Sequence, residues 1–466
     1  MKIKLYIACC ITLSTPVLAQ EVPPAQNVFF QNIPQIQPEL LLNQPDIDTP
    51  NPAPTKENSS LEERINFAII HKDWLELEKL LGQYRTATNF DPTLYDYGLG
   101  ALYRHQGRQK EAITLYRQIL ARQPDLHYPR FDLAMMLYED KRYAEAKTEL
   151  ETAAPYLAPP LQSLVGQVLA SIKKSQEWQP NFNLSYESTD NVNQASDIRE
   201  LVVGEATFIR SDDSLPQEAH GIRYNVGAAK EKNIMGNHYA YTSIDTEGVN
   251  YWDNSDYSEL TLQANLGYRH KNIERSWGAV AIAGQNLLGG SQYNQNYGLT
   301  LEYNRKISDQ WQISGNLSHI QKRYTDDDLA SYYDGHANST AWILLYQPKP
   351  RWLVYAGADF MRDDLADQAE SSDRQGIRGG MVFSGDKISL RSSLRYAQRD
   401  FKADNFFYGE KRKDDEYQFS TTLGHKKLSW HGFTPKLNYE YQKIDSNLPL
   451  YERSNSTFFV KVDKRF

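Results

Sequence analysis

Apolar and polar residues alternate with a period of two along the chain from residue 181 to its end. In LTLQANLGYR (260–269), an apolar residue occupies every second position, and a polar residue or glycine lies between. WQISGNL, WLVYAGADF and ISLRSSLRY show the same alternation. This pattern is typical of strands with one apolar and one polar face. Fourteen such strands are predicted, near 181–189, 219–229, 237–246, 257–269, 275–284, 296–305, 310–321, 336–347, 351–361, 375–383, 387–398, 415–425, 430–442 and 455–466.

The connections between these segments alternate between short and long. KEKNIMG, HKNIE, SGDK and HKKLS are short, whereas 190–218, 322–335 and 443–454 are long. Outer-membrane barrels combine an even number of strands with short periplasmic turns and long outer loops. Tryptophans follow the short turns, at the height of an aromatic girdle: Trp277, Trp311, Trp352 and Trp430. Residues 181–466 are therefore predicted to form a 14-stranded antiparallel transmembrane β-barrel with both termini in the periplasm.

Between residues 61 and 177 the apolar residues follow a helical period instead. LYDYGLGALYRHQGRQKEAITLYRQILARQP has the small and apolar residues of one tetratricopeptide repeat at the expected spacing. The same residue classes return 34 positions later, where KRYAEA matches GRQKEA. HKDWLELEKLL fits a degenerate earlier repeat, and 160–176 fits a capping helix. The predicted fold class is therefore a periplasmic tetratricopeptide-repeat helical domain, 61–177, followed by the barrel, 181–466.

Stacks of such repeats present a concave surface to a peptide or a protein. Repeat spacing places seven residues on this inner face, and we predict that they bind a polypeptide partner: Tyr97, Arg104, His105, Tyr128, Phe131, Met135 and Tyr138. The alternative is that some of these aromatic residues only pack between helices. Under either interpretation these residues make packing or binding contacts and take no part in catalysis.

The first 60 residues differ from both regions. Lys2 and Lys4 precede a short apolar run that ends in Val-Leu-Ala, so residues 1–19 are expected to be a cleaved signal peptide. Residues 20–60 hold eight of the 21 prolines, a density that no helix or central strand tolerates, and are expected to form a disordered linker. Both cysteines of the chain lie in the signal peptide. The mature chain is therefore expected to use neither disulfides nor thiolate chemistry.

Composition and motifs narrow the function classes further. The chain carries 51 Lys and Arg against 59 Asp and Glu, which disfavours a nucleic-acid partner. The sequence contains no H-E-x-x-H, G-x-S-x-G or P-loop motif, so no enzyme activity and no cofactor is expected. The acidic stretches TDDDLASYYDG and RDDLADQAESSD lack the spacing of a calcium loop. They are expected to be solvated outer loops rather than a metal site.

The chain ends in the alternating sequence STFFVKVDKRF. A strand that runs to the last residue needs a partner, and in a closed barrel that partner is the first strand. Lys464 interrupts the apolar register there, either as a snorkelling side chain or as part of a seam that can open. The residues assigned to barrel closure, and for the last one to an assembly signal, are Phe182, Leu184, Tyr186, Phe458, Val460, Val462 and Phe466.

The chain resembles the surface lipoprotein assembly modulator (Slam) family of outer-membrane proteins. The resemblance spans about 61–466 and is carried by YRHQGRQKEAITLYRQIL, by the barrel start NFNLSYESTDNVNQAS and by the ending VDKRF. It implies a protein of the cell outer membrane that translocates client proteins and has no catalytic residue. It also implies that the clients are surface lipoproteins that capture host iron carriers or haem, or soluble haem-binding proteins.

The sequence thus predicts an outer-membrane translocon whose repeat domain receives a client in the periplasm. The expected partners are the client, the barrel-assembly machinery and periplasmic chaperones, and the protein is expected to be a monomer. Two alternatives stay open at this point, a polysaccharide-export porin and a general diffusion porin. The first usually carries more repeats, and the second has no need of a repeat domain.

Overall fold

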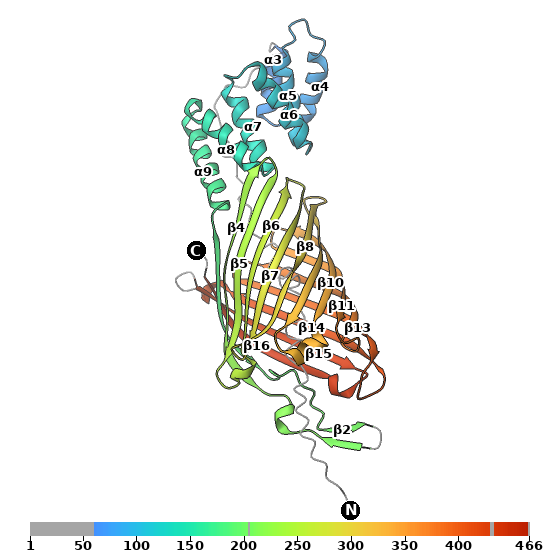
Figure 1. Cartoon of the computed structure of the whole chain (residues 1–466). Coiled ribbons are helices and arrows are strands. Elements are labelled where there is room, and N and C mark those ends of the chain that lie inside the picture. The colour runs from blue at the N-terminus through green and yellow to red at the C-terminus, as the bar shows by residue number, and fades with distance from the viewer. Residues whose placement is uncertain (1–59, 204–205, 429–432, 465–466) are drawn as a thin grey trace, which may run out of the picture.

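The computed structural model describes residues 60–203, 206–428 and 433–464. Helices come first and a closed barrel of strands follows, with the helical region at one end of the barrel (Figure 1). The predicted fold class, repeat helices followed by a 14-stranded antiparallel barrel, is confirmed. The expected signal peptide, nearly all of the expected linker, Trp430 and Phe466 lie outside the described residues.

The helical region is built from successive helix pairs. Gly107, in the turn between the helices of one pair, has a φ of +76°, and Lys141, 34 positions later, has a φ of +64°. Glycine adopts this left-handed conformation without strain, whereas lysine does so at a cost. No helix in the described ranges is both long and apolar enough to cross a membrane. The helices are α3 (Leu61–Ile70), α4 (Trp74–Tyr84), α5 (Pro92–His105), α6 (Gln109–Arg122), α7 (His127–Glu139), α8 (Tyr143–Ala153) and α9 (Pro159–Ser175).

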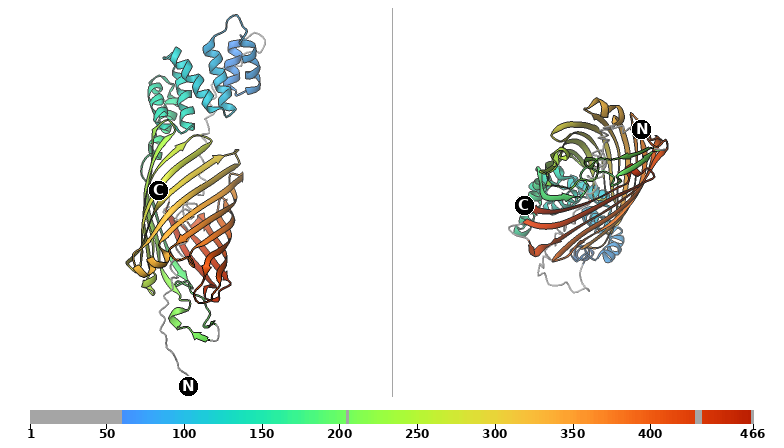
Figure 2. Two further views of the ribbon diagram at one scale, coloured as in Figure 1. Left: turned by 45° about the vertical axis from the view of Figure 1, so that its right-hand side comes forward. Right: turned by 90° about the horizontal axis from the view of Figure 1, so that it is seen from below.

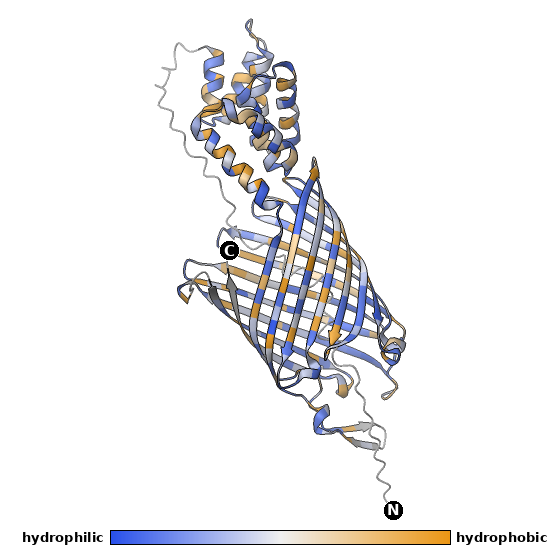
Figure 3. Ribbon diagram, turned by 60° about the vertical axis from the view of Figure 1, so that its left-hand side comes forward, coloured by the Kyte–Doolittle hydropathy of each residue, from blue (hydrophilic) through white to orange (hydrophobic). Residues whose placement is uncertain are grey.

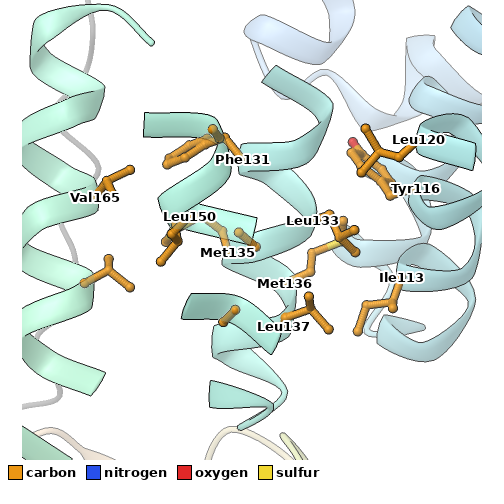
Figure 4. Packing of buried hydrophobic residues seen from close by; sticks show 14 of the residues in the cluster. Ile113, Tyr116, Leu120, Phe131, Leu133, Met135, Met136, Leu137, Leu150 and Val165 are labelled. Carbon is orange, nitrogen blue, oxygen red and sulfur yellow. The ribbon is translucent and has the colours of Figure 1, made fainter. Parts of the chain in front are cut away.

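Small residues recur where paired helices approach closely. A Cβ atom at Gly100 of α5 would lie 2.5 Å from the ring of Tyr116 on α6. The equivalent positions of the next repeat hold Ala134 and Leu150, which are completely buried. Figure 4 shows the core that results, in which side chains from α6, α7, α8 and α9 meet. The 34-residue period therefore reflects the space available between helices.

Fourteen strands form one closed barrel, and β1 pairs with both β4 and β16. A separate two-stranded sheet, β2 with β3, lies at the end of the barrel opposite the helices (Figures 1 and 2). The barrel strands are β1 (Gln179–Thr189), β4 (Ala219–Met235), β5 (His238–Tyr251), β6 (Glu259–Lys271), β7 (Arg275–Leu288), β8 (Ser291–Lys306), β9 (Trp311–Tyr324), β10 (Gly335–Lys349), β11 (Trp352–Leu365), β12 (Ser372–Ser384), β13 (Ile388–Asp404), β14 (Lys411–His425), β15 (Phe433–Ser446) and β16 (Arg453–Lys464).

The two faces of the barrel wall differ in polarity. Hydrophobic and hydrophilic residues alternate along the strands (Figure 3). Leu266 and Leu394 are more than 60% exposed on the outside. Thr300 lines the interior cavity and is buried, as is Ser318, whose Oγ lies 2.9 Å from Thr300 Oγ1. Three of the predicted girdle tryptophans, Trp277, Trp311 and Trp352, are also exposed. An apolar exterior around a polar interior is the arrangement that a bilayer requires of a barrel.

The strands extend further than the alternation predicts, and the outer loops are correspondingly shorter. β13 runs to Asp404 instead of 398, and β7 and β8 are joined through Gly289 and Gly290, both with positive φ. Two consecutive glycines with positive φ suit a two-residue hairpin turn, which is why the predicted loop 285–295 is mostly strand. The small sheet of β2 (Glu200–Val203) and β3 (Ala206–Ile209) was not predicted.

The turns on the side of the repeat helices are short, for example 236–237 and 350–351, whereas the opposite side carries 190–218 and 325–334. Short turns face the periplasm in barrels of this kind. The repeat helices therefore lie on the periplasmic side of the membrane, and the β2–β3 sheet lies on the cell surface.

Candidate functional site

The inner face of the repeat domain is the first candidate site. Tyr97 on α5 donates a hydrogen bond to Asp132 Oδ2 on α7 over 2.7 Å, and Arg104 Nε donates to Glu139 Oε2 over 3.2 Å. Burial raises the pKa of Asp132, and burial together with Asp132 raises the pKa of Tyr97. Two of the predicted residues, Tyr97 and Arg104, therefore form polar contacts that connect α5 to α7.

The other predicted groove residues divide into buried and exposed groups. Phe131 and Met135 are 8% and 7% exposed and belong to the core, where Phe131 points toward Val165 of α9 (Figure 4). For these two residues the geometry favours packing between helices. Tyr138 bonds to Ser171 over 3.0 Å, and His105 stacks on Trp74. Tyr128 is 52% exposed, so its ring is available to a partner.

The repeat domain is docked onto the periplasmic turns of the barrel. Asn237 Nδ2, in the β4–β5 turn, donates to the carbonyl oxygens of Asp140 and Lys271, each over 2.6 Å. Tyr239 donates to the carbonyl of Lys141, and the N–H of Ala144 donates to Asn233 Oδ1 over 2.8 Å. The left-handed turn at Lys141 therefore touches the barrel directly.

The strands enclose a cavity of about 900 Å³ lined mainly by polar side chains. In its wall, Tyr251 donates to Glu187 Oε1 over 2.6 Å, and Arg223 forms a two-pronged ion pair with the same carboxylate. Val192 and Gln194, from the segment after β1, also line the cavity. The interior is therefore polar along the strands and partly covered from the outer side.

The wall formed by β11, β12 and β13 contains a buried network of ions. Asp359 on β11 pairs with Arg378 on β12 and with Arg395 on β13, the latter over 2.8 Å. Asp363, on the same strand, lies 3.2 Å from Lys322 Nζ and 3.3 Å from Arg399 Nη2. Charges buried this far from water are stable only when paired, so the network ties neighbouring strands together.

Among the residues that the structure describes, the seam between β1 and β16 is the shortest ladder of the barrel. It contains six residue pairs, from Leu184–Val462 to Thr189–Thr457, whereas β1 and β4 share eleven pairs. Of the predicted closure residues, Leu184 lies opposite Val462 and Tyr186 opposite Val460; Phe458 lies opposite Ser188. Phe182 pairs only with Val226 on β4 within the described ranges.

Residues 189–196, which we call the outer clasp, fasten the cell-surface end of this seam. Asn191 is 2% exposed, and its Nδ2 donates to the carbonyls of Ser454 and Ala195 over 2.8 Å each. Asp190 Oδ1 accepts from the N–H of Ser456, and Ser196 Oγ donates to the carbonyl of Pro449. The clasp extends the contact between the first and last strands beyond the ladder itself.

The sequence did not predict the bonds of the outer clasp, although the clasp residues stand in a distinctive stretch. NVNQAS lies in the stretch that carries the family resemblance, and Asn residues that directly follow a strand are a signal for side-chain to backbone bonds. Asp326, in one of the acidic loops, accepts from the N–H of Leu329 and begins α10 (Asp327–Tyr333). Among the residues that the structure describes, no three His, Cys, Asp or Glu side chains gather to hold a metal ion.

Comparison with known proteins gives matches in both regions. Residues 178–466 match the family described as "Surface lipoprotein assembly modifier", and residues 54–150 match its N-terminal TPR repeats. A surface lipoprotein assembly modifier of Pasteurella multocida is 28% identical over 86% of this chain and 81% of its own length. The hemophilin secretion modulator of Acinetobacter baumannii is 23% identical over 88% of this chain and 86% of its own length.

Solved structures resemble the chain only loosely. The Pseudomonas putida toluene transporter TodX covers 62% of this chain and 90% of its own, with a TM-score of 0.36 and 10% identity. The family match, in contrast, extends over the whole barrel region. The chain therefore belongs to the surface lipoprotein assembly modifier family of the cell outer membrane, as the sequence predicts.

Proposed function

We propose that this protein exports or displays client proteins at the cell surface and that its repeat domain receives each client in the periplasm. The observation that carries the proposal is the family match over the entire barrel, 178–466. The names of two relatives indicate the client class: one is an assembly modifier of surface lipoproteins and the other a secretion modulator of hemophilin. The client of this chain is accordingly a surface lipoprotein or a secreted haem- or iron-binding protein.

The repeat domain is well placed for reception. It is held on the periplasmic turns through Asn237 and Tyr239, and only residues 176–178 separate α9 from β1. The partners we infer are periplasmic chaperones that deliver the client and the barrel-assembly machinery that inserts this chain, which acts as a monomer. The protein performs no chemistry on its client in this proposal.

Neither alternative function draws comparable support. A general diffusion porin has no use for a repeat domain docked on its periplasmic rim. A polysaccharide-export porin is also disfavoured, because both family matches are to proteins named for lipoprotein assembly. Conductance measured on the purified protein in planar bilayers separates these functions, since a porin gives a stable open channel without any client.

The proposal is tested by deleting the gene in its native host and comparing surface proteins by protease shaving of intact cells. At least one surface lipoprotein or secreted haem-binding protein is expected to leave the surface and return with the full-length gene. A surface protein profile unchanged by the deletion would refute the export function.

The reception step is tested with Tyr128→Ala, on the predicted inner face, and with Leu75→Ala as a matched control. Leu75 is 82% exposed on α4 and takes no part in the predicted face. Client display should fall several-fold with the first variant and stay unchanged with the second. Equal display by both variants would remove Tyr128 from the reception surface.

A further inference from the structure

Within the ranges that the structure describes, β1 near Phe182 has a strand partner on only one side. Its ladder with β4 begins at Gln179–Ala229, but its ladder with β16 ends at Leu184–Val462. Asp463 and Lys464 continue to pair with β15 and no longer with β1. Among the described residues, Phe182 and Asn183 thus form an edge within an otherwise closed wall, because Lys464 and Asp463, which the register places opposite them, pair only with β15.

The phase of the strand shows which backbone groups line this edge. The N–H of Asp190, just past β1, donates to the carbonyl of Ser456 across the seam. Residues in phase with Asp190 turn their N–H and C=O groups the same way, so those of Phe182 face the seam. Pro180, the next residue in phase, has no N–H at all, which is typical of a strand edge.

This edge lies at the height of the apolar band. Phe182 and Val226, directly opposite each other on β1 and β4, are both exposed on the outer face. Backbone polar groups at this depth have no water to bond, so an unpaired group is costly there. The cost is removed when an extended segment adds to the edge and supplies the missing bonds.

The side chains of the edge define what such a segment must look like. Asn181 and Asn183 turn to the interior, where they lie within bonding distance of Asp245 and Asn225. Phe182 and Leu184 turn to the outside. A segment paired with this edge therefore needs apolar residues facing lipid and polar residues facing the cavity, in strict alternation.

We propose that the periplasmic edge of β1 is a strand-addition site for an extended, alternating segment of the client, which pairs first with Phe182 and then with Leu184 as the end of β16 gives way. This inference rests on the proposed export function and names its entry point. The repeat domain leads directly into this edge, because only residues 176–178 separate α9 from β1. This connection is held against the barrel, since Gln176 Oε1 accepts from the N–H of Asn233 on β4. The outer clasp keeps the barrel closed above the entry point.

A reversible staple tests the opening step. Ser185 lies opposite Lys461 at the lower end of the seam, and the two cysteines of the chain are Cys9 and Cys10, within the predicted signal peptide. Ser185→Cys with Lys461→Cys therefore introduces a single engineered disulfide. Thr300→Cys with Ser318→Cys, paired across β8 and β9, is the matched control. The probe is an epitope-tagged copy of the surface protein that the gene deletion removes. We expect the oxidised seam staple to lower display of this client at least tenfold, reductant to restore it, and the control staple to have no effect.

Photo-crosslinking tests the pairing itself. A benzoylphenylalanine at Phe182, which is 53% exposed, should crosslink to the tagged client, whereas the same group at Phe360, 41% exposed on β11, should not. Unchanged display by the oxidised seam staple, or a crosslink from residue 182 only to this chain's own terminal segments, would overturn the inference. If no surface protein depends on the gene, the export function fails instead, so the two failures are distinguishable.

Discussion

Strands β11, β12 and β13 and the seam between β1 and β16 close the same barrel in different ways. β11 and β12 share twelve residue pairs and β12 and β13 share thirteen, and buried ions cross both ladders. In the described part of the chain, the seam has six pairs, polar clasp bonds at the cell-surface end and an unpaired edge near Phe182 at the periplasmic end. The β11–β13 wall therefore has more paired residues and more buried ion pairs than the seam. We infer that the barrel wall separates more easily at the seam.

The largest effect is expected from breaking the ion network of the β11–β13 wall. Asp359→Ala leaves the guanidinium groups of Arg378 and Arg395 without their shared carboxylate. Removing one partner of a buried ion pair costs about 3–5 kcal/mol. Urea unfolding of the purified barrel in lipid vesicles, followed by tryptophan fluorescence, measures the change. A loss under about 1 kcal/mol would show that the network does not stabilise this wall.

The polar face of this wall was predictable, but its pairing was not. ISLRSSLRY shows that Arg395 shares a face with Arg391. Nothing local in the sequence shows that Asp359, 36 residues earlier, would meet Arg395, because that contact depends on the register of two ladders. The same limit applies to the clasp, in which Asn191 meets Ser454, 263 residues later in the chain.

Periodicity predicted the barrel better than the repeat groove. A strand in a bilayer must alternate, so the strand count and the inward and outward faces follow from the alternation of apolar and polar residues. In the repeat domain, aromatic residues serve both packing and binding, and spacing does not separate the two roles. Phe131 is therefore placed on the inner face by spacing and lies in the core in the structure.

A smaller effect is expected from loosening the outer end of the seam. Asn191→Ala removes three hydrogen bonds, two to Ala195 and one to Ser454, and leaves buried backbone groups unsatisfied. The expected cost is about 1–3 kcal/mol. Hydrogen exchange of the amides of residues 454–457 should accelerate, whereas exchange in β11–β13 should not change. Equal acceleration in both regions would mean that the clasp serves general stability rather than the seam.

A still smaller effect is expected from weakening the contact between the repeat domain and the periplasmic turns of the barrel. Asn237→Ala removes the bonds to the carbonyls of Asp140 and Lys271, which are near solvent at the rim. We expect a loss of about 1 kcal/mol in docking, seen as faster protease cleavage at 176–178 with barrel unfolding unchanged. If cleavage stays at the wild-type rate, the remaining hydrogen bonds between the two regions, such as that of Tyr239 with Lys141, are enough to hold the repeat domain beside β1.

The smallest effect is expected on the β11–β13 wall itself, where an ion pair is exposed. Arg351 Nη2 lies 2.8 Å from Asp386 Oδ1 at the periplasmic ends of β11 and β12, and both side chains are more than half exposed. Water and salt screen such a pair, which contributes about 0–1 kcal/mol. Arg351→Ala should therefore leave the urea midpoint nearly unchanged, and any shift should vanish at high salt. A loss comparable with that of Asp359→Ala would show that charge pairing as such, rather than burial, makes this wall stronger than the seam.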